Sequence, residues 1–318
     1  MHKSLFAAAL ATLLLAAPSH AQQATPAGAW TAKKPLPTAR NEVSLAAVGD
    51  RVYVVGGSIS GNAVPMIDEY NPATDTWRTR AAMPKGLDHM GTVVLNGKIV
   101  TVGGFIGSVH RGAVADVYEY DPASDTWRAL APLKAPRGSA AAAVLDGKIH
   151  AVGGRGLDNT FTLGTHEVYD PATNTWSERA ALPQPRDHMA LVAIDGRLHA
   201  IGGRVTNPAS RTDLHDIYDP KTNTWLAAPP LPTARSGLAY AAYRGMIVVL
   251  GGELAPNTFP ENEAFDPKSL RWRTLAAMPA GRHGTGAAVL GNAIYVAAGS
   301  LKPGSGEVTD QLIVFTMP

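Results

Sequence analysis

The sequence predicts an all-β fold, a six-bladed propeller in which each blade is an antiparallel sheet of four strands. The first observation is the spacing of the six tryptophans, which recur every 47 to 50 residues at Trp30, Trp77, Trp127, Trp176, Trp225 and Trp272. The second is a glycine pair with the same period, at positions 56–57, 103–104, 153–154, 202–203 and 251–252, with Ala298 and Gly299 as an altered sixth copy. Internal repeats of this length are typical of propellers and solenoids.

Within each repeat, the residue types change in the order expected for four short strands. The first strand is small and apolar, as in residues 139–145, and a turn such as Asp146-Gly147 connects it to a β-branched second strand, as in residues 51–55. Asp-Gly favours the positive φ angles of a type I′ hairpin, so these strands are expected to be antiparallel neighbours. After the glycine pair, a loop of variable length leads to a third strand that ends in an aromatic residue, as in residues 117–120.

A turn of nearly fixed sequence connects the third strand to the fourth. It begins with Asn or Asp followed by Pro and ends at the tryptophan, as in residues 71–77 and 170–176. The Asx side chain caps backbone amides and proline presets φ, so the segment is expected to turn sharply. Four-stranded sheets of this kind bury both faces when they pack around an axis, with the small first strands at the centre and the bulky tryptophans outside.

Taken together, the apolar strand, Asp-Gly turn, second strand, Gly-Gly pair, Tyr-Asp-Pro turn and spaced tryptophan resemble kelch repeats. The resemblance covers essentially all of residues 22–318, with five full copies and one split copy. Residues 30–34 carry the fourth-strand signature without the preceding three strands, whereas residues 286–290, 293–297 and 311–315 supply three strands without a fourth. We expect the N-terminal strand to complete the last blade and close the ring.

Residues 1–21 have the features of a signal peptide: a basic start, an apolar run, and small residues before a cleavage site after Ala21. This predicts export to a bacterial periplasm or to the exterior, and residues 22–318 then form one domain. The chain has no cysteine and a formal charge of +2. We therefore expect no disulfides, no nucleic-acid partner, no membrane association, and a monomer.

The turns before the first strands and the loops after the second strands should open on one side of the ring. Those turns carry a series of cations, one per repeat: Arg40, Lys85, Arg137, Arg186, Arg235 and Arg282. If they surround one mouth of the channel, they form an anion-binding funnel, because arginine matches carboxylate and phosphate groups. The alternative is structural, with each arginine holding turn carbonyls or pairing with an acidic residue nearby.

Other candidate ligand-binding residues come from the same turns and from the variable loops. Three turns add His89, His188 and His283, with Asp88 and Asp187 beside the first two. The loops add Arg155, Arg204 and Glu253 as candidates, and His110, His166, Arg211 and His215 as further polar groups. The histidines could equally make hydrogen bonds within the turns. There is no His-x-His or His-Glu-x-x-His spacing, so neither a metal ion nor a cofactor is expected.

Two functions remain open. The first is an exported binding protein that recognises an anionic ligand, such as an acidic sugar, a peptide carboxylate or a protein partner, at the mouth of the channel. The second follows from a distant similarity to N-acetylneuraminate epimerases, exported kelch propellers, and implies a cofactor-free mutarotase or epimerase of acidic sugars. Such chemistry needs one acid and one base, for which Glu253 and His188 are the candidates, although no catalytic residue can be transferred from that family.

Three other enzyme classes are disfavoured by the residues present. The kelch-containing copper radical oxidases need a cysteine crosslinked to tyrosine, and this chain has no cysteine. Iron-dependent specifier proteins would show a Glu-x-x-x-Asp-x-x-x-His series, and hydrolases a Gly-x-Ser-x-Gly elbow between a strand and a helix; we find neither.

Overall fold

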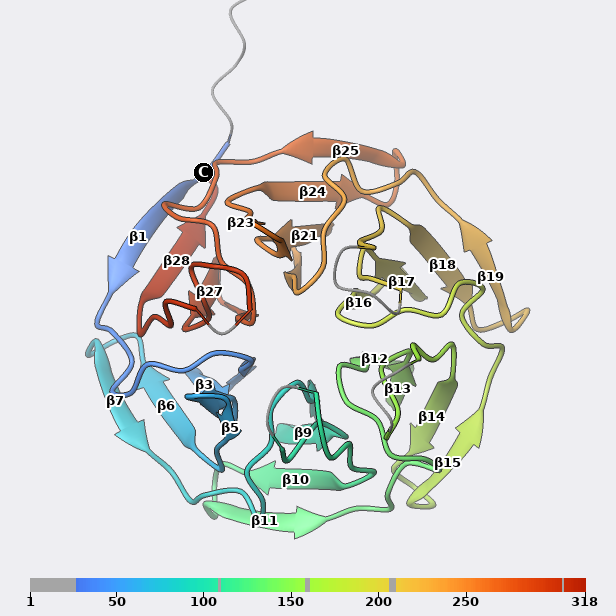
Figure 1. The fold of residues 1–318 in the computed structure, drawn as a ribbon, viewed down its shortest axis with the longest axis horizontal. Helices are drawn as coiled ribbons and strands as arrows, with labels where there is room; N and C mark the ends of the chain where they lie inside the picture. Colours follow the sequence, from blue (N-terminus) through green and yellow to red (C-terminus); the bar gives the residue numbers. More distant parts are fainter. Residues whose placement is uncertain (1–26, 108–109, 158–160, 206–209, 305) are drawn as a thin grey trace, which may run out of the picture.

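A computed structural model describes residues 27–107, 110–157, 161–205, 210–304 and 306–318. The predicted signal peptide, residues 1–21, lies outside the described residues. These contain strands and turns, and among them there is no helix that is long and apolar enough to cross a membrane. Six sheets of four antiparallel strands are arranged around a central channel (Figure 1). The predicted six-bladed propeller is therefore confirmed.

Each of the first five blades is continuous in sequence. Blade 1 contains β2 (Ser44–Val48), β3 (Arg51–Val55), β6 (Ile67–Asn71) and β7 (Thr76–Thr79). Blade 2 contains β8 (Gly91–Leu95), β9 (Lys98–Val102), β10 (Val117–Asp121) and β11 (Thr126–Ala129). Blade 3 contains β12 (Ala141–Leu145), β13 (Lys148–Val152), β14 (His166–Asp170) and β15 (Thr175–Glu178). Blade 4 contains β16 (Ala190–Ile194), β17 (Arg197–Ile201), β18 (His215–Asp219) and β19 (Thr224–Ala227). Blade 5 contains β20 (Ala239–Tyr243), β21 (Met246–Leu250), β24 (Asn262–Asp266) and β25 (Arg271–Thr274).

Blade 6 is assembled from both ends of the described chain. It contains β26 (Gly286–Leu290), β27 (Ala293–Ala297) and β28 (Leu312–Thr316), and β1 (Ala29–Lys33) is its outermost strand. In the antiparallel pairing of β1 with β28, Trp30 lies opposite Phe315, and their ring centroids are 5.1 Å apart. The predicted closure of the ring by the N-terminal strand is confirmed.

The tryptophans that define the repeat connect neighbouring blades. Each indole Nε1 donates a hydrogen bond to a backbone carbonyl in the segment between the preceding blade and its own, at 2.8–3.0 Å. The Asx-Pro turns add a second connection: Asp125, for example, accepts hydrogen bonds from Tyr120 Oη in its own blade and from the backbone amide of Ala81. These turns are therefore part of the packing between blades.

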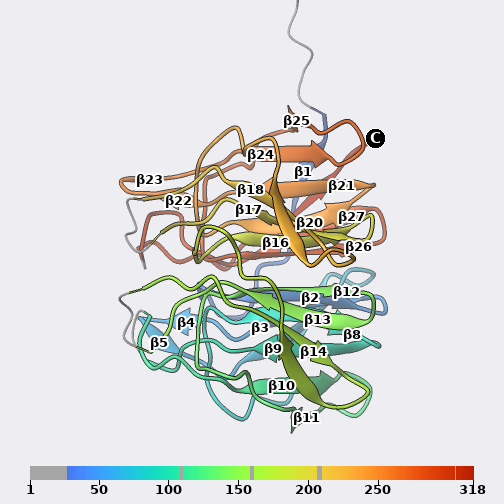
Figure 2. The same ribbon diagram turned by 90° about the vertical axis from the view of Figure 1, so that its right-hand side faces the viewer.

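The loops that follow the second strands lie on the opposite side of the ring from the Asx-Pro turns. Two of them form small hairpins, β4 (Ser58–Ile59) with β5 (Asn62–Ala63), and β22 (Glu253–Leu254) with β23 (Asn257–Thr258). Both hairpins lie on the same side of the molecule (Figure 2). This side carries the variable loops, and it is where the channel-facing polar residues are found.

Candidate functional site

The five repeated arginines lie inside the blades and not in the channel mouth. Their side chains are at most 1% exposed. Four of them contact a carboxylate on the third strand of their own blade. The pairs are Arg40 with Asp68 at 2.8 Å, Arg137 with Glu167 at 3.0 Å, Arg186 with Asp216 at 2.8 Å, and Arg235 with Glu263. Arg282 donates instead to the side-chain oxygen of Gln311 at 2.8 Å. Burial and pairing leave none of these guanidinium groups open to the channel, so the expected ring of cations is not formed.

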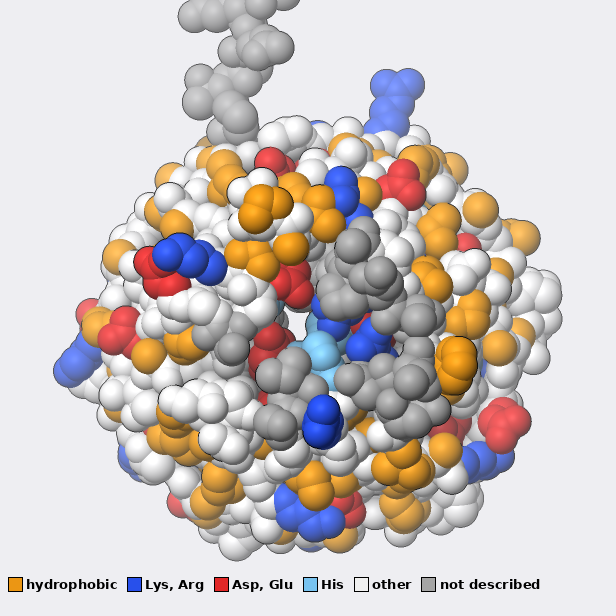
Figure 3. All heavy atoms as spheres, viewed as in Figure 1, with side chains coloured by type: hydrophobic (Ala, Val, Ile, Leu, Met, Phe, Trp, Pro, Cys, Tyr) orange, Lys and Arg blue, Asp and Glu red, His pale blue; other side chains and the backbone are white. Residues whose placement is uncertain are grey.

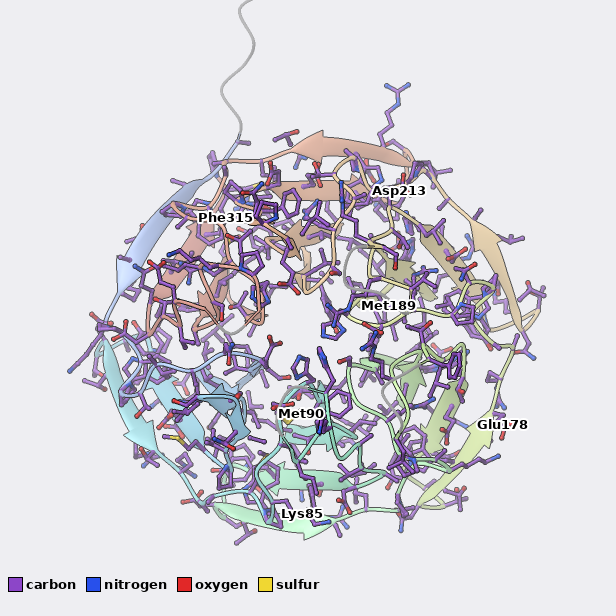
Figure 4. All side chains as sticks on the ribbon, viewed as in Figure 1. Lys85, Met90, Glu178, Met189, Asp213 and Phe315 are labelled. Carbon is purple, nitrogen blue, oxygen red and sulfur yellow. The ribbon has the colours of Figure 1, made fainter. Side chains whose placement is uncertain are left out.

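Lys85 is also outside the channel. It is half-exposed, its Nζ lies 2.7 Å from Asp116 Oδ2, and Figure 4 shows it at the outer edge of the ring. In blade 2, the position of the repeated arginine is occupied by Leu87, and that of its carboxylate partner by Tyr118. Both are buried in one apolar cluster. This blade has therefore replaced the buried ion pair with an apolar contact.

The residue two positions after each of the five repeated arginines, and after Leu87 in blade 2, faces the channel. These six residues are Glu42, His89, Ser139, His188, Gly237 and Gly284, and all have φ between 50° and 66°. These six residues form a ring around the channel, connected by backbone hydrogen bonds between neighbouring blades. His89 N donates to Glu42 O at 3.3 Å, Ser139 N to His89 O at 2.8 Å, and Gly237 N to His188 O at 3.0 Å. A non-glycine residue in this left-handed region costs on the order of 1 kcal/mol or more, and such conformations cluster at functional sites.

A cavity of about 260 Å³ occupies the mouth of the channel above this ring. It is lined by five of the residues that the sequence nominated for ligand binding: His89, His188, Arg204, Glu253 and His283. Figure 3 shows histidine, basic and acidic side chains around the opening. The structure therefore brings together residues from blades 2, 4, 5 and 6 that lie up to 194 positions apart in sequence.

On the basic side of this site, Asp187 holds two arginines and a histidine together. It is fully buried, and it contacts Arg155 Nε at 2.6 Å, Arg204 Nε at 2.9 Å, and His188 Nδ1. Burial alone would raise the pKa of Asp187, but the charges of His188, Arg204 and Arg155 outweigh it and hold the pKa well below its usual range. The positive charge of the two loop arginines is therefore partly balanced before any ligand arrives.

The acidic side of the cavity is formed by Glu42 and Glu253. Glu42 Oε2 lies 3.0 Å from His89 Nε2. Burial alone would raise the pKa of Glu42, but the interactions with His89 and His283 outweigh burial and lower it. Glu253 Oε1 lies 3.4 Å from Arg204 Nη1, and its Oε2 accepts a hydrogen bond from Gly304 N at 3.0 Å. The mouth thus combines carboxylates with cations, and it is not the funnel of repeated arginines expected from the sequence.

The imidazoles in the cavity differ in charge. Burial alone would lower the pKa of His89, but the neighbouring Glu42 and Asp88 carboxylates raise it to about 10. For His188, burial and then the Arg204 charge lower the pKa to about 3, despite the contact with Asp187. Burial and the charges of His89 and His188 also lower the pKa of His110. A charged imidazole therefore lies beside two neutral ones, and the ring centroids of His89 and His188 are 5.0 Å apart.

The sequence alone did not identify Glu42 as a site residue, and it mentioned His110 only among additional polar groups. Glu42 could have been found by aligning the repeats, because it occupies the position of His89 and His188. His166 and His215 lie in the cores of their blades, where they pair with His150 and His199 at 2.9 and 2.8 Å. These two are therefore not part of the channel site.

Comparisons with known proteins agree with this architecture. Residues 28–181 match a family model described as the KLHDC2/KLHL20/DRC7 Kelch-repeats domain, and residues 185–232 match the Kelch motif. Kelch-like protein terF of Aspergillus terreus is 34% identical over 84 residues, which are 24% of this chain and 18% of that protein. Mouse Kelch-like protein 35 is 32% identical over 75 residues, covering 24% and 12%, and Beta-scruin of Limulus polyphemus is 35% identical over 78 residues, covering 24% and 8%. The matches thus span less than a fifth of these relatives.

A solved structure, that of YjhT, has the same fold. It superposes with a TM-score of 0.76 over 88% of this chain and 95% of that chain, at 19% sequence identity. The two family models, the kelch-like relatives and the six four-stranded blades all lead to one assignment. The chain is a kelch-repeat β-propeller protein.

Proposed function

We propose that this protein is an exported bacterial binding protein, periplasmic or secreted, that holds a small anionic ligand such as an acidic sugar in the mouth of its channel. The observation that carries the proposal is the convergence of His89, His188, Arg204, Glu253 and His283 on one cavity of about 260 Å³. A cavity of this size suits a monosaccharide better than a protein chain, and its few convergent polar groups are typical of small-molecule sites. Kelch domains commonly mediate protein interactions, which makes a protein partner the competing outcome of the test.

Arg204 supports an acidic group on the ligand. Its Nε is held by Asp187 at 2.9 Å, which fixes the guanidinium, and among the described residues Nη1 makes a long contact of 3.4 Å with Glu253. A ligand carboxylate could replace that long contact with a shorter, charge-assisted hydrogen bond. Glu42 and Glu253 would accept hydrogen bonds from sugar hydroxyls. This arrangement selects a ligand with both an acidic group and hydroxyls.

Thermal-shift measurements against sialic acid, uronic acids, phosphosugars and neutral sugars test the proposal. A ligand present at one hundred times its Kd stabilises the folded state by about 2.7 kcal/mol, so a specific ligand gives a clear rise in Tm. We expect acidic sugars to stabilise the wild type and to lose the effect in Arg204→Gln, while Arg197→Gln, a change on an exposed strand end, keeps it. Stabilisation by neutral sugars only would reject the acidic ligand, and no stabilisation by any sugar would favour a protein partner.

A second candidate function is mutarotation of the same class of sugar, and one specific contact favours it. The guanidinium of Arg204 reaches both sequence-nominated catalytic residues, with Nη1 3.4 Å from Glu253 Oε1 and Nη2 3.1 Å from His188 Nε2. A sugar carboxylate held by Arg204 would place the sugar ring between a carboxylate and an imidazole. One of the two groups must enter the reaction protonated: it would give its proton to the ring oxygen while the other group takes the proton of the anomeric hydroxyl, which opens the ring, and the two groups exchange roles when the ring closes. NMR saturation exchange between anomers measures this step, and exchange rates unchanged by the protein across the acidic sugars would remove the enzyme function while leaving binding intact.

A further inference from the structure

Three histidines meet in the channel mouth although no sequence motif links them. His89 comes from the turn before β8, His110 from the loop after β9, and His188 from the turn before β16. One ring nitrogen from each residue lies within 4.8 Å of the other two, and Nε2 of His110 is 3.1 Å from Nε2 of His188. Sequence spacing could not reveal this cluster, because it spans two non-adjacent blades and separations of 21 and 78 residues.

Buried carboxylates set the orientation of two of these rings. His89 Nδ1 lies 2.8 Å from Asp88 Oδ1, and His188 Nδ1 contacts Asp187 Oδ1. Asp88 and Asp187 are at most 1% exposed. A carboxylate at Nδ1 keeps the proton on that atom and directs the other nitrogen, Nε2, into the channel. This carboxylate–histidine arrangement is the usual support of a metal-ligating imidazole.

The channel-facing nitrogens of His110 and His188 lie close together, at a distance that suits two ligands of one cation. His188 Nε2 has three polar neighbours: His110 Nε2 at 3.1 Å, Arg204 Nη2 at 3.1 Å and Ser139 Oγ at 3.4 Å. Metal–nitrogen bonds of about 2.0–2.1 Å in tetrahedral geometry separate two ligand nitrogens by about 3.3 Å, close to the observed distance between His110 and His188. His89 offers a ring nitrogen within 4.8 Å of the ligand atoms of His110 and His188, so it is the third ligand.

We propose that His89, His110 and His188 bind one divalent transition-metal ion through their Nε2 atoms, with a fourth position open to the cavity. A metal ion would displace the Nε2 proton of His89, which in the free protein faces Glu42 Oε2 at 3.0 Å. Three imidazoles in the neutral form suit Zn²⁺, Cu²⁺, Ni²⁺ and Fe²⁺, and three histidines with an open position is a known arrangement of zinc sites that bind water or substrate. Glu42, whose Oε2 lies 3.0 Å from His89 Nε2, is a carboxylate beside the cluster that could take the fourth position. An oxygen of a carboxylate or hydroxyl ligand could occupy that position instead.

Charge around the cluster is compatible with a cation. Arg204 opposes it, but Asp88, Glu42 and Glu253 line the same cavity. Asp187, behind His188, pairs with Arg155 and Arg204. On metal binding, Arg204 Nη2 would give up its contacts with His110 and His188 at 3.2 and 3.1 Å. Nε would keep its contact with Asp187, and Nη1 its contact with Glu253. The carboxylates therefore outnumber the one arginine that lines the cavity.

Metal titration of the untagged full-length protein, purified after export and stripped with EDTA, tests the proposal. We expect one Zn²⁺ per chain in competition with a fluorescent chelator, and Co²⁺ to give the intense visible absorption of a tetrahedral site. His110→Ala, on a loop, and His188→Ala should each abolish this absorption. Asp88→Asn should weaken Zn²⁺ binding about 10- to 100-fold, the usual effect of losing a supporting carboxylate.

The control is His199→Gln, which changes a histidine in the core of blade 4, away from the channel, and should leave stoichiometry and affinity unchanged. Circular dichroism and Tm of each variant separate loss of metal from loss of fold. Absence of Zn²⁺ and Co²⁺ binding by the wild type, or binding that survives in His110→Ala combined with His188→Ala, would overturn the proposal. Because no sugar is present in this titration, its result is independent of the proposed ligand binding.

Discussion

Breaking one buried ion pair should strongly destabilise the propeller, whereas replacing both partners should not. Arg40 and Asp68 are both 0% exposed, and their charged atoms are 2.8 Å apart. Arg40 also donates to the carbonyls of Gly56 at 2.9 Å and Val54 at 3.2 Å. Arg40→Leu leaves an unpaired carboxylate and unsatisfied carbonyls in the blade, and loss of one partner from a buried pair costs about 3–5 kcal/mol.

The chain itself contains the compensating change. In blade 2, Leu87 and Tyr118 occupy the corresponding positions and pack in one apolar cluster. The double variant Arg40→Leu/Asp68→Tyr copies that pair, and buried ion pairs replaced by apolar residues are often neutral in stability. We therefore expect the double variant to recover at least about 2 kcal/mol of the loss, as a coupling between contacting residues.

Urea unfolding and calorimetry of the two variants give the measurement. A loss of about 3–5 kcal/mol lowers Tm by roughly 6–20 °C for a chain of this size. Arg78→Leu is the matched control, since Arg78 contacts Glu69 from a side chain that is 63% exposed, and exposed pairs contribute about 0–1 kcal/mol. If Arg40→Leu cost less than about 1 kcal/mol, or if the double variant were as unstable as the single one, the structural role of the repeated arginines would be refuted.

Three further predictions concern the closure, the axis and the core histidines. Trp30→Ala should lower the free energy of unfolding by about 2–4 kcal/mol, because Trp30 packs on Phe315 and donates to Ala276 O where β1 closes the ring. Calorimetry should show the loss, and an unchanged Tm would argue against closure by β1. Gly286→Ala should lower the free energy of unfolding by about 1–3 kcal/mol, since an added Cβ would lie 2.6 Å from the backbone nitrogen of Leu45. Gly156→Ala is the control: the nearest atom to its added Cβ is at 4.0 Å, so the same assay should show no change. Burial, followed by the charge of His215, lowers the pKa of His199 to about 3. Between that value and about 6.5 the unfolded state binds more protons than the folded state, so the free energy of unfolding should fall as the pH decreases through this window. The urea midpoint of His199→Gln should depend less on pH, and a pH dependence identical to that of the wild type would contradict a buried neutral imidazole.

The sequence predicted the fold almost completely because each blade repeats the same local signals. The tryptophan spacing, the glycine pairs and the Asx-Pro turns fix strand order and register within a blade, and the missing fourth strand at one end matched the extra strand at the other. These features depend on turn chemistry and strand pairing, which are local in sequence.

The site was predicted only in part, because its charges are decided by contacts between distant segments. His89, His188, Arg204, Glu253 and His283 were nominated from loop position and do line one cavity. The repeated arginines have the same residue type as Arg204, but the carboxylates on the third strands draw them into the blades, a pairing that lies 28 to 30 residues away in sequence. Lys85 lies two residues before the position of the repeated arginine in blade 2, which Leu87 occupies. The three-histidine cluster depends on how blades 2 and 4 face each other across the channel.

Hydrogen exchange monitored by mass spectrometry, with and without the acidic sugar that gives the largest thermal shift, tests the location of function most directly. Bound ligand should slow exchange in the mouth segments 41–44, 88–90, 187–189 and 253–258, and leave the Asx-Pro turns at 71–77, 121–127 and 170–176 unchanged. Those turns lie on the opposite side of the ring and serve the packing between blades. Protection at the Asx-Pro turns without protection at the mouth would contradict the assignment of the channel mouth as the ligand site.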